Sequence, residues 1–368
     1  MKKLSAELSK FLTKVMTMGA GTALPIVMSP TELAKLIGVV YSDNNLGHLI
    51  AQRSSSLWDA IAPPENYYYD IDTTWFDQGV ELSGNMHVEL MLFGIDDIPD
   101  FKTYLHCLSE LHKRRKKYSK ILSAQPLPEM IQISPRALIE FGTVEHQALA
   151  SWLTWRKFFY DLDNRAAQET GYLFEPILSY ALGGEQVSAR GKAVVRQNDP
   201  TKGRQVDCWK VLPDGRKLAY EFKLRVTIAA SGQGRFGEEI QFAIDARLSG
   251  ATPILLVLDP TMNHRLDDLQ KAYQENGGVV YLGDAAWEHL EEESGVIMSN
   301  FIDRYVHSPI QCISRYEKNS LGTLDLSRNN LLDFNASNKN GSLIFKFGEI
   351  EKIIHRHEDG NIVNNDDE

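Results

Sequence analysis

The chain has 368 residues, of which 43% are hydrophobic and 24% charged, and its formal net charge is -10. This is the composition of a globular protein, and no apolar run approaches the ~20 residues that a membrane span needs. The three cysteines, Cys107, Cys208 and Cys312, are widely separated. Their odd number and their spacing exclude a disulfide framework and a zinc motif, and indicate a reducing, cytoplasmic environment.

Residues 1–150 are predicted to be mainly helical, with breaks at their prolines. The longest predicted helix runs from Asp100 to Lys120 and contains the basic run from His112 to Lys117. Such a run usually forms a solvated face. The alternative is a contact with a nucleic-acid backbone, because clustered cations release counterions from phosphates. The net charge of -10 counts against this alternative. For DNA binding, however, the charge of the binding face matters more than the net charge of the chain.

From residue 151 to 306 the pattern changes. A helix from Thr154 or Asp163 to Leu182 is predicted to end at Gly183-Gly184. The segments after it are predicted as strands at 186–195, 206–212 and 217–226, a glycine-rich loop at 231–235, helices at 237–248, 266–275 and 285–292, and strands at 252–258 and 279–282. A strand meander followed by alternating helices and strands indicates an α/β fold with a mixed sheet flanked by helices.

The chain turns polar after about residue 307, and its end is acidic. We therefore predict three regions: a mainly helical N-terminal region at 1–150, an α/β core at 151–306, and a C-terminal extension at 307–368 with a disordered acidic tail.

A turn signal at 213–215, Pro-Asp-Gly, lies between two strand-like runs and predicts a β-hairpin. A two-residue turn would place Asp207 opposite Phe222, and a three-residue turn would place it opposite Glu221. In either case Asp207 lies within one residue of Glu221 across the ladder. Because paired strands are about 4.8 Å apart, the two carboxylates can share one cation.

Glu221 and Lys223 are two residues apart on the second strand, so they point to one face, whereas Phe222 points to the other. Two carboxylates and an ammonium thus converge. Carboxylate oxygens suit Mg²⁺, which binds through one or two carboxylates together with water and a substrate phosphate. The lysine can position or deprotonate a water, or stabilise a charged transition state.

This pattern resembles the bipartite motif of the PD-(D/E)XK nucleases, with Asp207, thirteen intervening residues, and then Glu221-Phe222-Lys223. The resemblance covers about 165–290 and includes the order of strands and helices. It implies a Mg²⁺-dependent, DNA-cleaving enzyme, with Asp207 and Glu221 as metal ligands and Lys223 as a catalytic residue. Asp214 also follows a proline, but it lies seven residues from Glu221, roughly 23 Å along a strand, which excludes it.

The resemblance also implies an acidic catalytic residue from the first core helix. Glu175 is the candidate, and Glu169 is the alternative. Pro176 would break or kink a continuous helix, which leaves the orientation of Glu175 open.

The glycine-rich segment after the second strand is predicted to approach a phosphate backbone through its N–H groups. Arg225 and Arg235 are candidates for binding phosphate or reading guanine, with Ser231 and Gln233 as further DNA contacts. The alternative is a flexible connection whose arginines stabilise the fold. Within the superfamily, the stretch 225–236 resembles the ApaLI-type enzymes.

A self-contained nuclease of this size, without a Walker motif, looks like a type II restriction endonuclease. The resemblance implies double-stranded DNA as substrate, a homodimer that mirrors a palindromic site, and a DNA methyltransferase in the same system. Region 1–150 would then serve DNA recognition or dimerisation. The alternatives are a DNA repair or mobile-element nuclease with the same site, a non-catalytic DNA-binding protein with the same fold, and an unrelated hydrolase.

Overall fold

The computed structural model describes residues 4–19, 24–79, 85–170, 174–225, 232–259, 264–314, 332–335, 341–347 and 350–356. The chain forms two compact units, each assembled from separate stretches of sequence. Unit 1 comprises Met1–Ser29, Ser109–Tyr172 and Arg315–Glu368, and unit 2 comprises Pro30–Leu108 and Leu173–Ser314. Among the described residues, no helix combines the length and the apolarity needed to cross a membrane.

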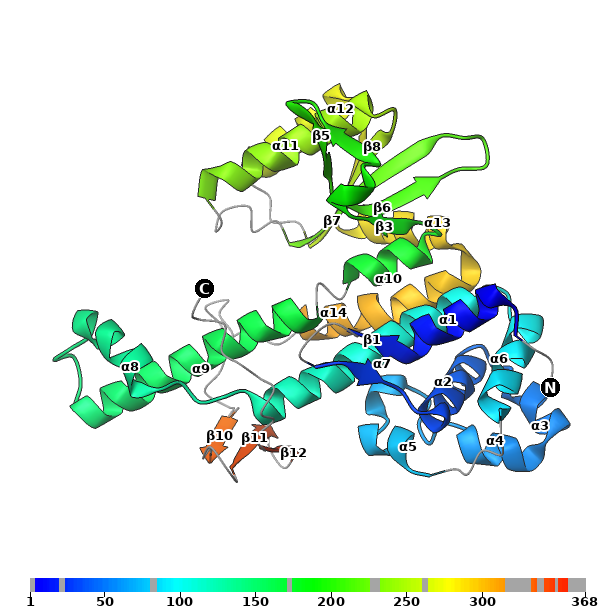
Figure 1. The fold of residues 1–368 in the computed structure, drawn as a ribbon, viewed down its shortest axis with the longest axis horizontal. Coiled ribbons are helices and arrows are strands. Elements are labelled where there is room, and N and C mark those ends of the chain that lie inside the picture. Colours follow the sequence, from blue (N-terminus) through cyan, green and yellow to red (C-terminus); the bar gives the residue numbers. More distant parts are fainter. Residues whose placement is uncertain are drawn as a thin grey trace. The chain divides into compact units, whose positions relative to one another are not determined.

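Unit 2 contains a five-stranded sheet in the order β3-β6-β7-β8-β9 (Figure 1). The strands are β3 (Glu185–Val187), β6 (Val206–Val211), β7 (Lys217–Arg225), β8 (Thr252–Asp259) and β9 (Val279–Leu282). Strands β3, β6 and β7 pair antiparallel, whereas β7, β8 and β9 pair parallel. The predicted mixed sheet is confirmed, and it arises because a hairpin continues into two helical crossovers.

Helices cover both faces of this sheet (Figure 1). They are α10 (Phe174–Ala181), α11 (Gly232–Leu248), α12 (His264–Glu275) and α13 (Asp284–Ile302). Leu255 and Val257 of β8 pack in one core cluster with Phe242 of α11 and Tyr273 of α12. Leu256 alternates with them, points to the opposite face and is also fully buried. Strand β8 is therefore buried on both faces, as its continuous apolar sequence predicted.

The predicted strand at 186–195 is wrong in its extent. After β3 the chain makes a 3-10 turn, η3 (Ala189–Gly191), and Lys192 takes a left-handed conformation with φ 52°. This turn directs the chain out of the sheet and into a separate two-stranded hairpin, formed by β4 (Val194–Arg196) and β5 (Asp199–Arg204).

Several predicted helix boundaries also differ from the structure; for example, the helix predicted at 285–292 extends to Ile302. The helix predicted to reach Leu182 consists of two helices, α9 (His146–Thr170) and α10. Pro176 lies in the first turn of α10, where a missing N–H removes no intrahelical hydrogen bond. The segment predicted as a loop at 231–235 is helical from Gly232 onward, where α11 begins.

The remainder of unit 2 is mainly helical, as predicted for the N-terminal region. Its elements are α2 (Pro30–Asp43), α3 (Gly47–Arg53), α4 (Ser55–Ile61), η1 (Tyr68–Asp70), α5 (Thr73–Asp77), α6 (Met86–Asp97), the start of α7 (Phe101–Ala124), η4 (Asp303–His307) and α14 (Ser308–Ser314). Buried Asp43 accepts hydrogen bonds from Tyr104 (2.8 Å) and Tyr305, and it pairs with Arg304 (3.0 Å). These bonds tie α2 and α7 to η4.

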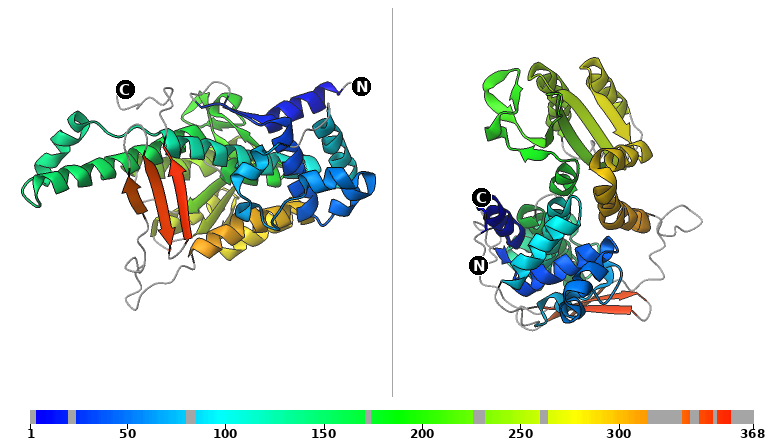
Figure 2. Two further views of the ribbon diagram at one scale, coloured as in Figure 1. Left: turned by 90° about the horizontal axis from the view of Figure 1, so that it is seen from below. Right: turned by 90° about the vertical axis from the view of Figure 1, so that its right-hand side faces the viewer.

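Unit 1 contains the remaining elements. They are α1 (Ala6–Met16), β1 (Thr17–Met18), β2 (Ile26–Val27), the rest of α7, α8 (Met130–Ile133), η2 (Ser134–Ile139), α9, and the strands β10 (Leu332–Asn335), β11 (Ser342–Phe347) and β12 (Ile350–His355). The last three strands form their own antiparallel sheet (Figure 2). Ile121, Phe158 and Leu343 share one core cluster, which joins α7, α9 and β11.

The basic run on α7 is partly buried within unit 1. Lys113 and Lys117 are fully buried. The ammonium of Lys113 donates to the carbonyl oxygens of Lys14 (2.7 Å) and Thr17 (3.1 Å), and it pairs with Glu110 at 2.6 Å. The expected solvated face is therefore wrong for these two lysines, and Lys113 serves the internal packing of unit 1.

Candidate active site

Strands β6 and β7 form the predicted hairpin, and its register brings two carboxylates together. Val211 pairs with Lys217, and the same register places Asp207 opposite Glu221. Residues 213–215 form the turn, so the structure has the three-residue alternative. The glycine at the end of this turn has φ 85°, a conformation that favours glycine because it has no Cβ.

Glu221 and Lys223 lie on one face of β7. The Nζ atom of Lys223 is 2.7 Å from Oε1 of Glu221, and the two side chains are only 22% and 18% exposed. Phe222 points to the opposite face, where its ring centroid lies 6.0 Å from that of Tyr220. The alternation along the strand therefore brings the carboxylate and the ammonium into contact, as the two-residue spacing predicted.

Asp207 is buried beside this pair. Its Oδ2 atom accepts a hydrogen bond from the backbone N–H of Phe222 at 2.9 Å. Burial, and then the nearby carboxylates of Glu221 and Glu175, hold the pKa of Asp207 well above its usual value. Acidic groups that repel one another in a dry environment are typical of a functional site, because a bound cation relieves the repulsion.

Glu175 comes from the first turn of α10. Burial and the charge of Glu221 raise the pKa of its carboxyl, whereas Lys223 acts in the opposite direction. These effects place Glu175 within electrostatic reach of the β7 pair. The side chain of Glu169 lies outside the part of the chain that is described.

Glu239 on α11 belongs to the same cluster, and the sequence analysis did not select it. Its Oε1 atom lies 3.2 Å from Nζ of Lys223, so the ammonium sits between two carboxylates. Among the described residues, its Oε2 atom is buried and has no hydrogen-bond partner. The available sequence signal was its position in the first helix after the strand that carries Glu221.

The charge of Lys223 follows from these neighbours. Burial acts to lower the pKa of its ammonium, but the carboxylates of Glu221 and Glu239 outweigh burial and raise the pKa above its ordinary value. The side chain is therefore protonated at neutral pH. In this state it donates hydrogen bonds.

The cluster opens into a cavity of about 360 Å³. Its lining residues are Ala189, Arg196, Gly203, Arg204, Gln205, Asp207, Glu221, Lys223, Glu238, Glu239 and Phe242. Arg204 of β5 is buried and pairs with the fully buried Asp245 of α11, and its guanidinium also donates to Glu238 at 2.9 Å. The β4–β5 hairpin thus forms one wall of the cavity and is fixed to α11 by these ion pairs.

The predicted DNA contacts lie where the structure describes little. Arg225 is the last residue of β7, and Gln233 and Arg235 lie in the first turn of α11. Their side chains, and the whole of Ser231, lie outside the described residues. These four contacts stay predictions.

The donors in this cluster fit a hard divalent cation. Asp207 and Glu221 supply carboxylate oxygens from paired strands, and their mutual repulsion favours a positive ion. Within the described residues, no group of three or more carboxylate, imidazole or thiol side chains is positioned to hold a metal ion by itself.

A mixed sheet flanked by helices, with two carboxylates and a lysine at the wall of one cavity, is the arrangement that the resemblance to the PD-(D/E)XK nucleases implies. Residues 55–307 match the model of the ApaLI-like restriction endonuclease family. Over an alignment of 371 positions the chain is 52% identical to the type II restriction enzyme ApaLI of Acetobacter pasteurianus, a match that covers 100% of this chain and 98% of that protein. The chain therefore belongs to the ApaLI-like restriction endonuclease family.

Proposed function

We propose that this chain is a Mg²⁺-dependent type II restriction endonuclease that hydrolyses phosphodiester bonds of double-stranded DNA at a specific short site. The observation that carries the proposal is the convergence of Asp207, Glu221 and Lys223 on one cavity. Membership of a restriction endonuclease family supports DNA as the substrate.

Each side chain has a distinct task in this proposal. Asp207 and Glu221 hold the cation, with Glu175 as a supporting carboxylate. When bound, Mg²⁺ supplies charge neutralisation at the phosphate and lowers the pKa of a bound water. Lys223, protonated between Glu221 and Glu239, donates hydrogen bonds to the attacking water or to a phosphate oxygen, and so stabilises the charge that develops there.

Cleavage of plasmid DNA tests the proposed function directly. We expect plasmids of known sequence to give discrete fragments with Mg²⁺, and to stay intact with excess chelator, because the carboxylate cluster needs a cation to accept a phosphate. Fragment ends mapped by sequencing should share one short motif. A smear of fragments would favour a repair or mobile-element nuclease, and DNA binding without cleavage under any divalent cation would favour a non-catalytic DNA-binding protein.

Substitution of Glu239 tests its proposed role in positioning Lys223. We expect Glu239→Gln to lower kcat by about 10- to 100-fold with little change in KM, because the ammonium loses one of its two carboxylates while DNA binding does not need it. Steady-state cleavage rates measured over a range of DNA concentrations separate the two parameters. The control is Glu288→Gln, an exposed glutamate of α13, which should keep wild-type kinetics. A Glu239→Gln enzyme with unchanged kcat would remove Glu239 from the site.

We also propose the partners that such an enzyme requires. A homodimer would match the two-fold symmetry of a palindromic site, and a DNA methyltransferase of the same specificity would protect the host genome. Arg225 ends the strand of Glu221, and Ser231, Gln233 and Arg235 come after it in the sequence. All four remain the proposed DNA contacts. Because the three cysteines are free thiols and the substrate is DNA, we place the protein in the cytoplasm.

A further inference from the structure

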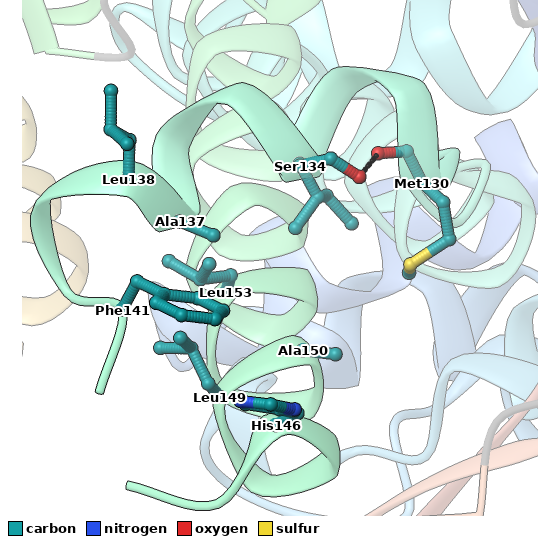
Figure 3. Close-up of a pocket in the computed structure, with 10 residues that line it drawn as sticks. Met130, Ser134, Ala137, Leu138, Phe141, His146, Leu149, Ala150 and Leu153 are labelled. Atoms are coloured by element: carbon teal, nitrogen blue, oxygen red, sulfur yellow. Dashed lines mark hydrogen bonds between the residues drawn. The ribbon is translucent and has the colours of Figure 1, made fainter. Parts of the chain in front are cut away.

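The cavity beside the catalytic cluster has a lining that suits a DNA backbone. A backbone of phosphates needs cations, and this cavity provides three of them, on Arg196, Arg204 and Lys223. By contrast, a cavity of about 470 Å³ in unit 1, between η2 and α9, is lined mainly by apolar side chains such as Phe141 and Leu149 (Figure 3). Among the described residues that line it there is no lysine or arginine. A strand of DNA therefore fits the cavity of unit 2.

The three cations of this cavity differ in how firmly they are held. Lys223 lies between two carboxylates, as described above. The side chain of Arg204 is only 8% exposed and is held by the fully buried Asp245. Arg196 is 37% exposed, and its partner Glu238, at 3.0 Å, is 52% exposed. Because water competes for both charges of an exposed ion pair, Arg196 is the cation that a phosphate can capture at the lowest cost.

The backbone around Arg196 is fixed on α11, although its side chain is exposed. The N–H of Val195 donates to the Oγ atom of Ser249 at 2.9 Å, and the N–H of Gln197 donates to Oδ1 of Asp245 at 2.9 Å. These two bonds hold the chain on either side of the arginine. A ligand of the guanidinium therefore has only a side chain to order, which favours binding.

Two consecutive residues of α11 connect Arg196 with the proposed catalytic lysine. Glu238 pairs with Arg196, and Glu239 pairs with Lys223. Consecutive Cα atoms are about 3.8 Å apart, so the two pairs are neighbours on the wall of the cavity. A DNA strand carries a charge about every 3.4 Å along the helix axis. A strand whose scissile phosphate lies at Lys223 therefore has further phosphates close to Arg196.

We propose that the guanidinium of Arg196 binds a phosphate of the DNA strand that enters the cavity, in exchange for the carboxylate of Glu238. A guanidinium can donate two parallel hydrogen bonds to a phosphate, which fixes the orientation of the strand. Glu238 keeps the hydrogen bond from Arg204 (2.9 Å) after the exchange, so its carboxylate retains a partner. This inference rests on the proposed function, because it takes DNA as the ligand.

The salt dependence of DNA binding tests the phosphate contact. The probe is a short fluorescent duplex that contains the motif found by plasmid digestion, or a mixed sequence if no motif is found, with chelator present. We expect Arg196→Gln to raise the dissociation constant about 10-fold, the effect of losing a charge-assisted hydrogen bond. It should also reduce the slope of log affinity against log salt by about 0.9, because one phosphate contact no longer releases a counterion.

A matched control removes the same charge elsewhere on α11. Arg247 lies in the last turn of this helix and outside the lining of the cavity. Arg247→Gln should therefore keep the wild-type affinity and salt slope. Urea denaturation should give wild-type midpoints for Arg196→Gln and Arg247→Gln, since exposed charges contribute little to stability.

Substitution of Glu238 tests the exchange. Glu238→Gln removes the carboxylate that competes with the phosphate, so we expect it to lower the dissociation constant about 3- to 10-fold. In a chain that also carries Arg196→Gln, the same substitution should have little effect, because the competition acts through this arginine.

Three results would overturn the proposal: a wild-type chain that binds no duplex, a folded Arg196→Gln variant with unchanged affinity and salt slope, or an effect of Glu238→Gln that is equally large in both backgrounds. Plasmid cleavage on the same preparations tests the proposed function separately. If the wild type cleaves and Arg196→Gln binds DNA like the wild type, the phosphate contact fails and the function stands. If the wild type binds without cleaving and Arg196→Gln weakens binding, the function fails and the contact stands.

Discussion

Replacing Asp207 by asparagine is expected to lower the rate of DNA cleavage by about a thousandfold or more, while DNA binding persists. The side chain keeps its size and can still accept the hydrogen bond from the N–H of Phe222, so the hairpin is retained. What disappears is the negative charge that, together with Glu221, favours a cation. Lys223→Ala is expected to have a similar effect on cleavage, because it removes the donor that stabilises the charged transition state.

The stability of the Asp207→Asn variant provides a readout that is independent of activity. A carboxyl whose pKa is raised in the folded state binds its proton more tightly there than in the unfolded chain, so its ionisation lowers stability as the pH rises above the ordinary carboxyl range. Asparagine removes this cost. The metal-free variant should therefore melt at the same temperature as the wild type at neutral pH, or at a higher one.

Thermal melts with and without Mg²⁺ complete this test. A cation that binds only the folded protein raises the melting temperature of the wild type, and it should raise that of Asp207→Asn far less. Cleavage is followed on a plasmid, and binding by gel shift in the presence of chelator. Wild-type cleavage by Asp207→Asn, or an equal Mg²⁺-induced shift in both proteins, would show that Asp207 is not a metal ligand.

The hairpin and the core strands could be predicted from the sequence because their signals are local. The turn residues at 213–215 fixed the register to within one residue, and the alternation of Glu221, Phe222 and Lys223 fixed their faces. Local signals did not decide between the two turn lengths. Gly215 has a left-handed conformation, and both turn lengths accept a glycine in this conformation. The presence of the glycine therefore does not distinguish the two turns.

The parts that escaped prediction depend on contacts between distant segments. Glu239 joins the site because α11 packs against β8, the neighbour of β7, and a position in the first helix after the strand does not by itself tell which face of that helix turns to the site. The burial of Lys113 depends on carbonyl groups of α1 and β1, almost a hundred residues away in sequence. The β4–β5 hairpin leaves the sheet at Lys192, a residue type with no preference for the left-handed conformation that it adopts.

The buried ion pair between Arg204 and Asp245 is expected to be the main attachment of the β4–β5 hairpin. Asp245 is fully buried, and it also accepts hydrogen bonds from the backbone N–H of Gln197 (2.9 Å) and from Gln241 (3.1 Å). Asp245→Ala leaves the guanidinium of Arg204 buried without its main partner. Such a loss costs about 3–5 kcal/mol in the free energy of unfolding.

Urea denaturation measures this cost, and a double substitution identifies its cause. Replacing both partners with apolar residues, Arg204→Met with Asp245→Leu, should recover most of the lost stability, because no uncompensated charge remains buried. The double variant should nevertheless cleave DNA slowly, since Arg204 and its partner Glu238 line the cavity beside Lys223 and Glu239. A cost below about 1 kcal/mol for Asp245→Ala, the range of exposed ion pairs, would mean that water reaches this pair. Full activity in a stable double variant would mean that the hairpin wall needs only to be present, and that the charge of Arg204 has no part in the chemistry.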